Sequence, residues 1–192
     1  NEENRECVMK ASIILSTYNR PQALLTVLEA LNLQTIQDFE VCIADDGSTK
    51  DTQQIIENFQ QKSAFPILHA WQDERGFRAA SARNNVVRMS SGDYLLFLDG
   101  DCIPRPNWIH QHLTLSEKHA FVAGNRVLLD ETLSHAIETH RIPFTDLFGL
   151  NVLRHKDHIN RLMPLLKIPL GSMRRLKPTS WAKVRTCNLG VW

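Results

Sequence analysis

The sequence has 192 residues, of which 43% are hydrophobic, and this is enough to bury one substantial core. No apolar run approaches the roughly eighteen residues of a membrane-spanning helix, and no basic segment followed by an apolar stretch begins the chain, so we expect a cytoplasmic protein. The four cysteines (Cys7, Cys42, Cys102 and Cys187) have no paired spacing, which favours reduced thiols over a disulfide framework and predicts no zinc site.

The charge is unevenly distributed along the chain. Residues 151–192 hold nine Lys or Arg against one acidic residue, so this segment carries +8, and the first 150 residues carry −7. Such a basic run, here residues 154–185, is typical of a solvated surface, or of one that binds an anionic acceptor or the anionic inner face of a membrane. The interleaved aromatic residues of a base-stacking surface are missing, so we expect no nucleic-acid partner.

Short apolar runs alternate with helical patterns along most of the chain. Expected strands cover 11–16, 39–44, 65–71, 95–98 and 121–129, and expected helices cover 21–33, a stretch from about Lys50, 77–89, 107–116 and 133–141. Strands that recur roughly every 28 residues with helices between them indicate right-handed βαβ units. The sequence therefore predicts an α/β fold: a Rossmann-like, mostly parallel sheet covered by helices on both faces.

The remaining segments are less regular. We expect residues 1–10 to be a flexible lead-in, 11–130 to form the ligand-binding core, and 131–192 to form a basic lid or acceptor-side segment. Residues 142–183 are rich in Pro, Gly and Arg and should be loosely ordered unless occupied. Residues 186–192 are strand-like again, and because the chain stops there we expect it to be part of a longer polypeptide.

Polar clusters follow four of the expected strands: STYN (16–19), DDGS (45–48), DERG (73–76) and DGD (99–101). Ligands of parallel α/β sheets bind at the carboxyl ends of the strands, so these clusters should meet at one edge. Either acidic pair alone would be weak evidence for a site. Asp-Gly-Ser is an ordinary turn sequence, and Asp99 and Asp101 could cap a turn or the helix near Asn107. Their joint order points to a binding site.

Asp99 and Asp101 are separated only by a glycine and follow four apolar residues, LLFL. A divalent cation would offset the cost of placing two carboxylates there, because Mg²⁺ and Mn²⁺ take oxygen ligands and leave positions for substrate phosphates. We therefore expect Mn²⁺ or Mg²⁺ at this strand end.

These motifs resemble those of the glycosyltransferases of family 2, which have the GT-A fold. The resemblance runs over SIILSTYNRPQALLTVLEALNLQT, FEVCIADDGSTKDT, ERGFRAASARN and SSGDYLLFLDGDCIPRPNWI, in that order, within about residues 11–130. It implies inverting transfer of a sugar from a UDP-sugar to a saccharide or glycolipid acceptor, in bacterial cell-surface polysaccharide or lipo-oligosaccharide synthesis.

The same resemblance implies individual roles. Ser16, Thr17 and the ring of Tyr18 would hold the nucleotide base, and Asp46 would accept the imide N–H of uracil with support from Asp45. The resemblance further implies that Asp99 contacts the ribose or the metal and that Asp101 ligates the metal at the diphosphate. Residue chemistry agrees, because a carboxylate is a pure acceptor and an aromatic ring stacks on a base.

Other side chains are open to two interpretations. Arg83 could help to neutralise the diphosphate or be a surface arginine, and Tyr18 could instead cover the edge of the core. Arg75, Arg78 and Asn84 are further candidates for the same ligand.

The general base that inverting transfer requires is unassigned. The resemblance places it in an acidic motif further along the chain, beyond Trp192, and neither Asp146 nor Asp157 lies in such a motif. An alternative is therefore a nucleotide-sugar-binding module without turnover. A sugar nucleotidyltransferase is disfavoured because STYNRPQ stands where its glycine-rich loop belongs, and the absence of GxGxxG and P-loop motifs argues against a dehydrogenase or ATPase.

Overall fold

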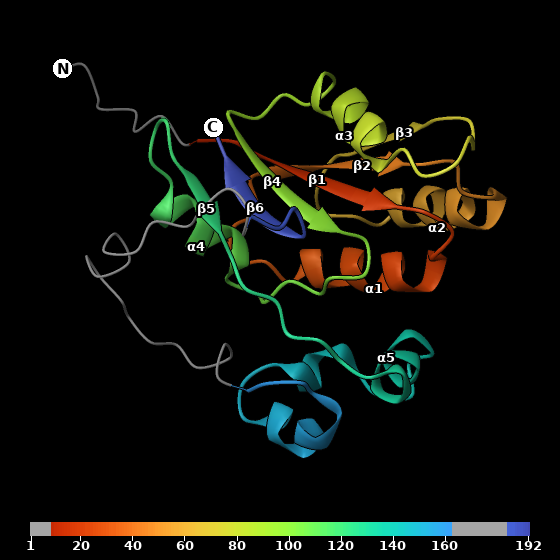
Figure 1. Ribbon diagram of the computed structural model, residues 1–192, viewed down its shortest axis with the longest axis vertical. Helices are drawn as coiled ribbons and strands as arrows, with labels where there is room; N and C mark the ends of the chain where they lie inside the picture. Colours follow the sequence, from red (N-terminus) through yellow and green to blue (C-terminus); the bar gives the residue numbers. More distant parts are fainter. Residues whose placement is uncertain (1–8, 163–183) are drawn as a thin grey trace.

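The computed structural model describes residues 9–162 and 184–192 (Figure 1). The described chain forms a six-stranded sheet in the order β3-β2-β1-β4-β6-β5. Its strands are β1 (Ala11–Thr17), β2 (Phe39–Asp45), β3 (Ile67–Trp71), β4 (Tyr94–Asp99), β5 (Phe121–Ala123) and β6 (Asn188–Val191). The first four strands are parallel, and β6 lies between β4 and β5, antiparallel to both. The prediction of a mostly parallel α/β sheet is confirmed.

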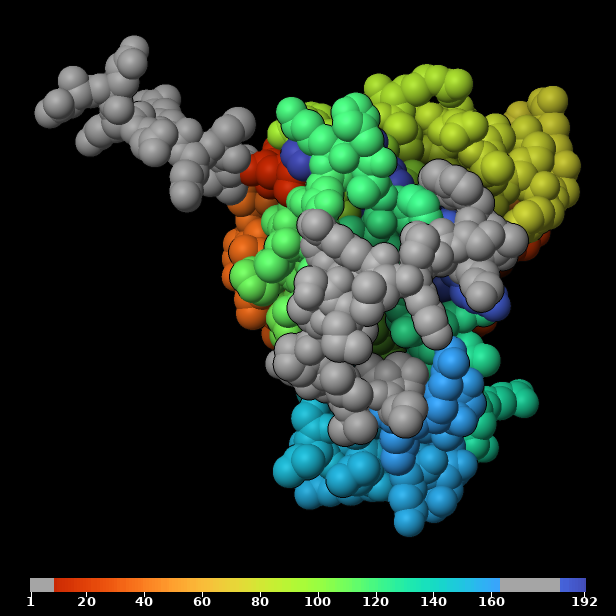
Figure 2. Space-filling model, turned by 60° about the vertical axis from the view of Figure 1, so that its left-hand side comes forward, coloured from red at the N-terminus to blue at the C-terminus, as the bar shows by residue number. Residues whose placement is uncertain are grey.

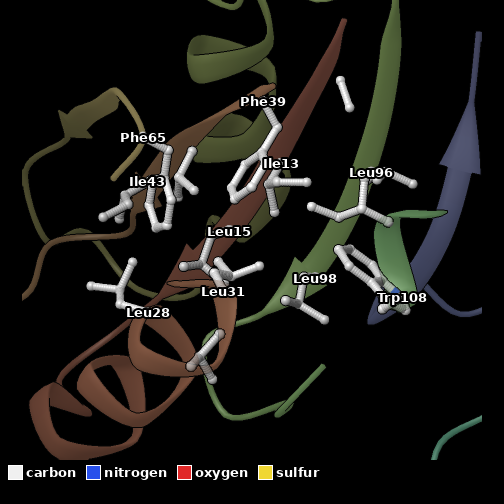
Figure 3. Packing of buried hydrophobic residues seen from close by; sticks show 14 of the residues in the cluster. Ile13, Leu15, Leu28, Leu31, Phe39, Ile43, Phe65, Leu96, Leu98 and Trp108 are labelled. Atoms are coloured by element: carbon white, nitrogen blue, oxygen red, sulfur yellow. The ribbon is translucent and has the colours of Figure 1, made fainter. Parts of the chain in front are cut away.

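Helices cover both faces of this sheet (Figure 1). They are α1 (Pro21–Asn32), α2 (Lys50–Gln60), α3 (Ala79–Val87), α4 (Trp108–Leu115) and α5 (Glu131–Glu138), followed by the 3₁₀ segments η1 (Phe144–Leu147) and η2 (Asn151–His158). Side chains of α1, α2 and α4 join Ile13 and Leu15 in the main core (Figure 3). Ile14, which points to the other face, packs with residues of α3. This two-sided burial is why the middle of β1, residues 13–15, is apolar without alternation.

Two predicted boundaries are wrong for identifiable reasons. The strand expected over 121–129 is only Phe121–Ala123. It pairs with β6 over these three residues, and the chain then leaves the sheet toward α5. The helix expected over 133–141 begins earlier, at Glu131, because the carboxylate of Asp130 accepts a hydrogen bond from the backbone N–H of Leu133 at 2.8 Å. That helix ends at Glu138.

The segments α5, η1 and η2 lie below the sheet in Figure 1, and their side chains form a second, smaller core. Leu133 and Ile137 of α5 pack there against Val152 and Ile159. The expectation of loose order over 142–183 is therefore wrong for residues 142–162, where side chains spaced irregularly in sequence still converge. The rest of that expectation, and most of the basic run 154–185, lie outside the described residues. Within the described chain, no helix is long and apolar enough to span a membrane.

Candidate functional site

The predicted site residues meet at the carboxyl edge of the parallel strands. In the register of the sheet, Ser16 of β1 lies opposite Asp99 of β4, and Thr17 lies opposite Asp45 of β2. The strand order reverses between β1 and β4, since the chain runs from β1 outward to β3 and then returns to the other side of β1. Such a reversal leaves a crevice between the diverging connections, which is where open α/β sheets bind ligands.

Asp45 is almost wholly buried, with 1% of its surface exposed, and it is held from two sides. One carboxylate oxygen accepts the backbone N–H of Ser48 at 2.8 Å, and the other lies 3.0 Å from Nε2 of His69. Burial alone would raise the pKa of Asp45, but the hydrogen bonds from His69 and Ser48 outweigh it and hold the pKa below its usual value. Asp45 is thus an ionised anchor for the loop after β2.

Asp46 follows Asp45 and is oriented by the segment after β3. Its Oδ1 accepts a hydrogen bond from Nε2 of Gln72 at 2.6 Å, and its Oδ2 accepts the backbone N–H of Arg78 at 2.7 Å. A carboxylate oxygen has two lone pairs, so each oxygen can still accept a further donor. Gln72 and the Arg78 backbone therefore fix the direction in which Asp46 can accept a ligand.

The loops after β1 and β2 are locked together. The backbone N–H of Asn19 donates to Oγ of Ser48 at 3.0 Å, and Oδ1 of Asn19 accepts the backbone N–H of Thr49 at 2.8 Å. Gly47 has φ +96°, and a Cβ there would lie 2.6 Å from the Cα of Glu74. Glycine is required at this position both by its backbone conformation and by the close approach of the loop after β3.

Tyr18 projects from this locked pair of loops. It is 49% exposed, so it does not cover the core, and this leaves its ring free to stack on a ligand. Trp71, at the end of β3, is also exposed and donates its indole N–H to the carbonyl of Ser48 at 3.0 Å.

Asp99, Arg83 and Ser16 form a closed polar triangle. Nη2 of Arg83 donates to Oδ1 of Asp99 at 2.7 Å and to Oγ of Ser16 at 2.8 Å, and that hydroxyl lies 3.1 Å from the same carboxylate oxygen. The Arg83 side chain is only 19% exposed, which rules out a solvated surface arginine. Arg83 thus contributes to offsetting the cost of the half-buried Asp99 carboxylate.

The turn after β4 is tight. The backbone N–H of Gly100 donates to the carbonyl of Ser16 at 2.7 Å, and a Cβ on Gly100 would approach that carbonyl oxygen to 2.7 Å. Asp101 follows on the outside of this turn, is exposed, and lines a cleft. The carboxylates of Asp99, at the strand end, and of Asp101, open to the cleft, are oxygen donors of the kind that a hard divalent cation such as Mn²⁺ or Mg²⁺ takes.

The cleft beside Asp101 has a volume of about 1000 Å³. It lies between the β4 end, α4, and the smaller core that holds α5, and both polar and apolar side chains line it, including Arg20, Trp108, Gln111 and Glu138. Arg20 lies just before α1, and its Nη2 is 2.6 Å from Oε1 of Glu138 at the end of α5. This ion pair joins the two walls of the cleft. Figure 2 gives a space-filling view of the molecule turned by 60° from the view of Figure 1.

The structure therefore brings together Ser16, Thr17, Tyr18, Asp45, Asp46, Arg83, Asp99 and Asp101 at one edge of the sheet. Arg75 instead pairs with Asp73, and both side chains are exposed. Asp146 lies 3.7 Å from Nε2 of His155, and Asp157 is exposed. Sequence reasoning missed Gln72 and His69, whose sequence signal is that they stand in or just after an apolar run. It included Asn19 only as part of the STYN cluster, without a role of its own.

A doubly wound sheet with acidic side chains at its topological switch point defines an α/β ligand-binding domain. The model of Glycosyl transferase family 2 matches residues 12–177, so the chain belongs to that family. The fold is GT-A: the chain resembles a mannosyltransferase from Pyrobaculum calidifontis, solved with GDP-Man and Mn²⁺, with a TM-score of 0.55 and 19% identity over 60% of this chain and 35% of that one. That likeness bears on the fold alone.

Two sequence relatives are polysaccharide synthases. Hyaluronan synthase from Pasteurella multocida is 36% identical over 122 residues, which are 62% of this chain and 12% of that protein. Chondroitin synthase from Escherichia coli is 35% identical over 190 residues, which are 92% of this chain and 26% of that protein. The chain thus spans about a quarter or less of the length of these two relatives.

Proposed function

We propose that this domain binds a UDP-sugar together with Mn²⁺ or Mg²⁺ and transfers the sugar, with inversion, to a hydroxyl of a saccharide or glycolipid acceptor. The observation that carries the proposal is the convergence of Asp46, Asp99 and Asp101 on one sheet edge beside a cleft of about 1000 Å³. The polysaccharide synthases among its relatives favour a role in the synthesis of cell-surface polysaccharide.

The nucleotide would lie across the ends of β1 and β2. The exposed ring of Tyr18 would stack on the base, held between the locked loops around Ser16 and Thr17. Asp46 would accept the imide N–H of uracil through a lone pair that Gln72 and the Arg78 backbone leave unused. Cytosine presents an acceptor at that position, so this contact would select UDP over CDP.

The ribose and diphosphate would lie over the end of β4. Asp99 would accept a hydrogen bond from a ribose hydroxyl or ligate the cation, and Asp101 would hold the cation at the diphosphate. When bound, the cation would neutralise the charge that develops on the departing diphosphate. Arg83 has a buried Nε with no hydrogen-bond partner among the described residues, and its guanidinium would add positive charge beside the same phosphates.

The transfer step forms a bond between the acceptor oxygen and the anomeric carbon while the bond from that carbon to the diphosphate breaks. The acceptor proton passes to a general base, and we assign this base to no described side chain. The cleft between α4 and α5 would place the acceptor on the side of the sugar opposite the diphosphate. A domain that binds donor without transfer would instead be a nucleotide-sugar-binding module.

The test is calorimetric titration of UDP into the chain with Mn²⁺ and again with a chelator. We expect binding with the cation and a loss of most of the affinity without it. Asp101→Asn should weaken UDP far more than uridine, while Asp93→Asn, an exposed acid at the opposite end of β4, should change neither. Equal UDP affinity with and without the chelator would overturn the role of the cation.

A further inference from the structure

Two cysteines that are 85 positions apart in the sequence meet beside Asp99. Their sulfur atoms and a carboxylate oxygen of Asp99 all lie within 4.8 Å of one another. Cys102 reaches this place because its backbone N–H closes the turn after β4 onto the carbonyl of Asp99 at 2.9 Å. Cys187 reaches it because the register of β6 pairs Asn188 with Leu98, which puts the preceding residue next to Asp99.

We propose that Cys102, Cys187 and Asp99 form a binding site for a soft divalent cation of the Zn²⁺ class, which shares Asp99 with the donor site but does not use Asp101. Thiolate sulfur and one carboxylate are a ligand set that Zn²⁺ takes and that Mg²⁺ and Mn²⁺ do not favour. The site goes beyond the proposed sugar transfer and does not depend on it.

The spacing suits a tetrahedral ion. Two sulfurs bound at about 2.3 Å around tetrahedral zinc lie roughly 3.8 Å apart, so side-chain shifts of about 1 Å would close the site. Three protein ligands leave the fourth position to water or to an anion. Both cysteines line the cleft that also exposes Asp101, so a cation has a route from solvent.

The surroundings of the site contain both charge signs. Cys102 is partly buried and donates its S–H to Oδ1 of Asp101 at 3.6 Å. The carboxylates of Asp99 and Asp101 beside these sulfur atoms place negative charge where a cation would bind.

Two arginines contact ligand atoms of this site. Arg83 donates to Oδ1 of Asp99, and the side-chain hydrogen bonds to that carboxylate among the described residues all go to Oδ1. Oδ2 therefore stays available to a metal ion. Nη1 of Arg126 donates to the sulfur of Cys187 at 3.6 Å. A cation must displace this contact, so Arg126→Gln should bind the cation more tightly than the wild type.

The site is tested by titrating Cd²⁺, a spectroscopic substitute for Zn²⁺, into the full chain with a phosphine reductant present. We expect one thiolate-to-metal absorption band that saturates at one equivalent. Cys102→Ser and Cys187→Ser should each weaken Cd²⁺ at least about 100-fold, since even outer-shell changes cost 10- to 100-fold. The matched control is Cys42→Ser, whose sulfur is buried on the α3 side of the sheet, and it should keep the band.

Folding of each variant is checked by circular dichroism, and calorimetry provides a second readout. Binding through two thiols should release about two protons per Cd²⁺ in the wild type, measured in buffers of different ionisation enthalpy. The absence of a band in the wild type, or a band unchanged in folded Cys102→Ser and Cys187→Ser, would overturn the proposal. UDP binding with Mn²⁺, measured in Cys102→Ser, should persist, which separates this site from the proposed function.

Discussion

Arg83 of α3 and Asp99 of β4 form an ion pair with Nη2 and Oδ1 2.7 Å apart, and the same nitrogen also donates to Ser16. This contact joins a helix on one face of the sheet to the ends of two central strands. It supplies part of the charge compensation that the acidic strand end requires, before any cation binds.

Replacing Arg83 by lysine should show how much the pair contributes. Lysine has a shorter side chain that ends in a compact ammonium group, so it cannot donate to Ser16 and Asp99 in the geometry of the guanidinium. We expect a loss of roughly 1–2 kcal/mol in the free energy of unfolding, measured in urea, and weaker UDP binding with Mn²⁺. Arg88→Lys is the control, because Arg88 is exposed directly after the same helix. An unchanged UDP affinity in folded Arg83→Lys would contradict the predicted contact with the diphosphate.

Asp46→Asn should weaken UDP binding by about 1–3 kcal/mol, because an amide can turn an N–H toward the uracil N–H and leave it unpaired. Gln72→Leu should have a smaller effect of about 1 kcal/mol, since it removes a hydrogen bond that orients Asp46 and leaves the acceptor itself in place. Calorimetry with UDP and CDP measures both variants. Equal binding of UDP and CDP by the wild type would show that Asp46 does not read the base.

The pair of Asp45 and His69 should make stability depend on pH in the acid range. The folded-state pKa of Asp45 lies below its usual value, so its contribution is fully present above about pH 4 and is lost as the pH falls through the folded-state pKa. Asp45→Asn should lower the free energy of unfolding by about 1–3 kcal/mol at pH 7. The gap between variant and wild type should narrow below about pH 4.

Denaturant unfolding measured from neutral to acid pH provides the data for that comparison. Asp93→Asn, which changes an exposed acid, should give a curve close to that of the wild type at every pH. A gap for Asp45→Asn that stays constant down to the lowest pH would show that the Asp45 carboxylate gains no net stabilisation from its hydrogen bonds.

Gly100→Ala should disturb the turn that presents Asp101. The added Cβ would lie 2.7 Å from the carbonyl oxygen of Ser16, which belongs to a central strand and cannot move freely. We expect a loss of about 1–3 kcal/mol in stability from this overpacking, together with weaker UDP binding in the presence of Mn²⁺. A variant that binds UDP with Mn²⁺ as well as the wild type would show that the turn tolerates displacement.

Local patterns were sufficient to predict much of the fold and the sheet edge at which the acidic side chains meet. Apolar runs that end in polar residues mark strand ends whatever their partners, and the carboxyl ends of parallel strands share one edge. The positions of Asp45, Asp46, Asp99 and Asp101 at that edge follow from these two facts. The family was predicted from four longer segments in a fixed order, each of which contains or follows a strand end.

Tertiary structure decided which of those side chains touch one another. The contact of Gln72 with Asp46 depends on the register of β3 beside β2, which pairs Trp71 with Asp45 and so sets the next residue of each strand side by side. The strand expected over 121–129 is cut short because its neighbour β6 comes from the far end of the chain. The meeting of Cys102 with Cys187 has the same origin, since it depends on the register of an antiparallel strand inserted between β4 and β5. A spacing of 85 residues carries no signal of such a contact, because strand order and register are set by packing across the whole sheet.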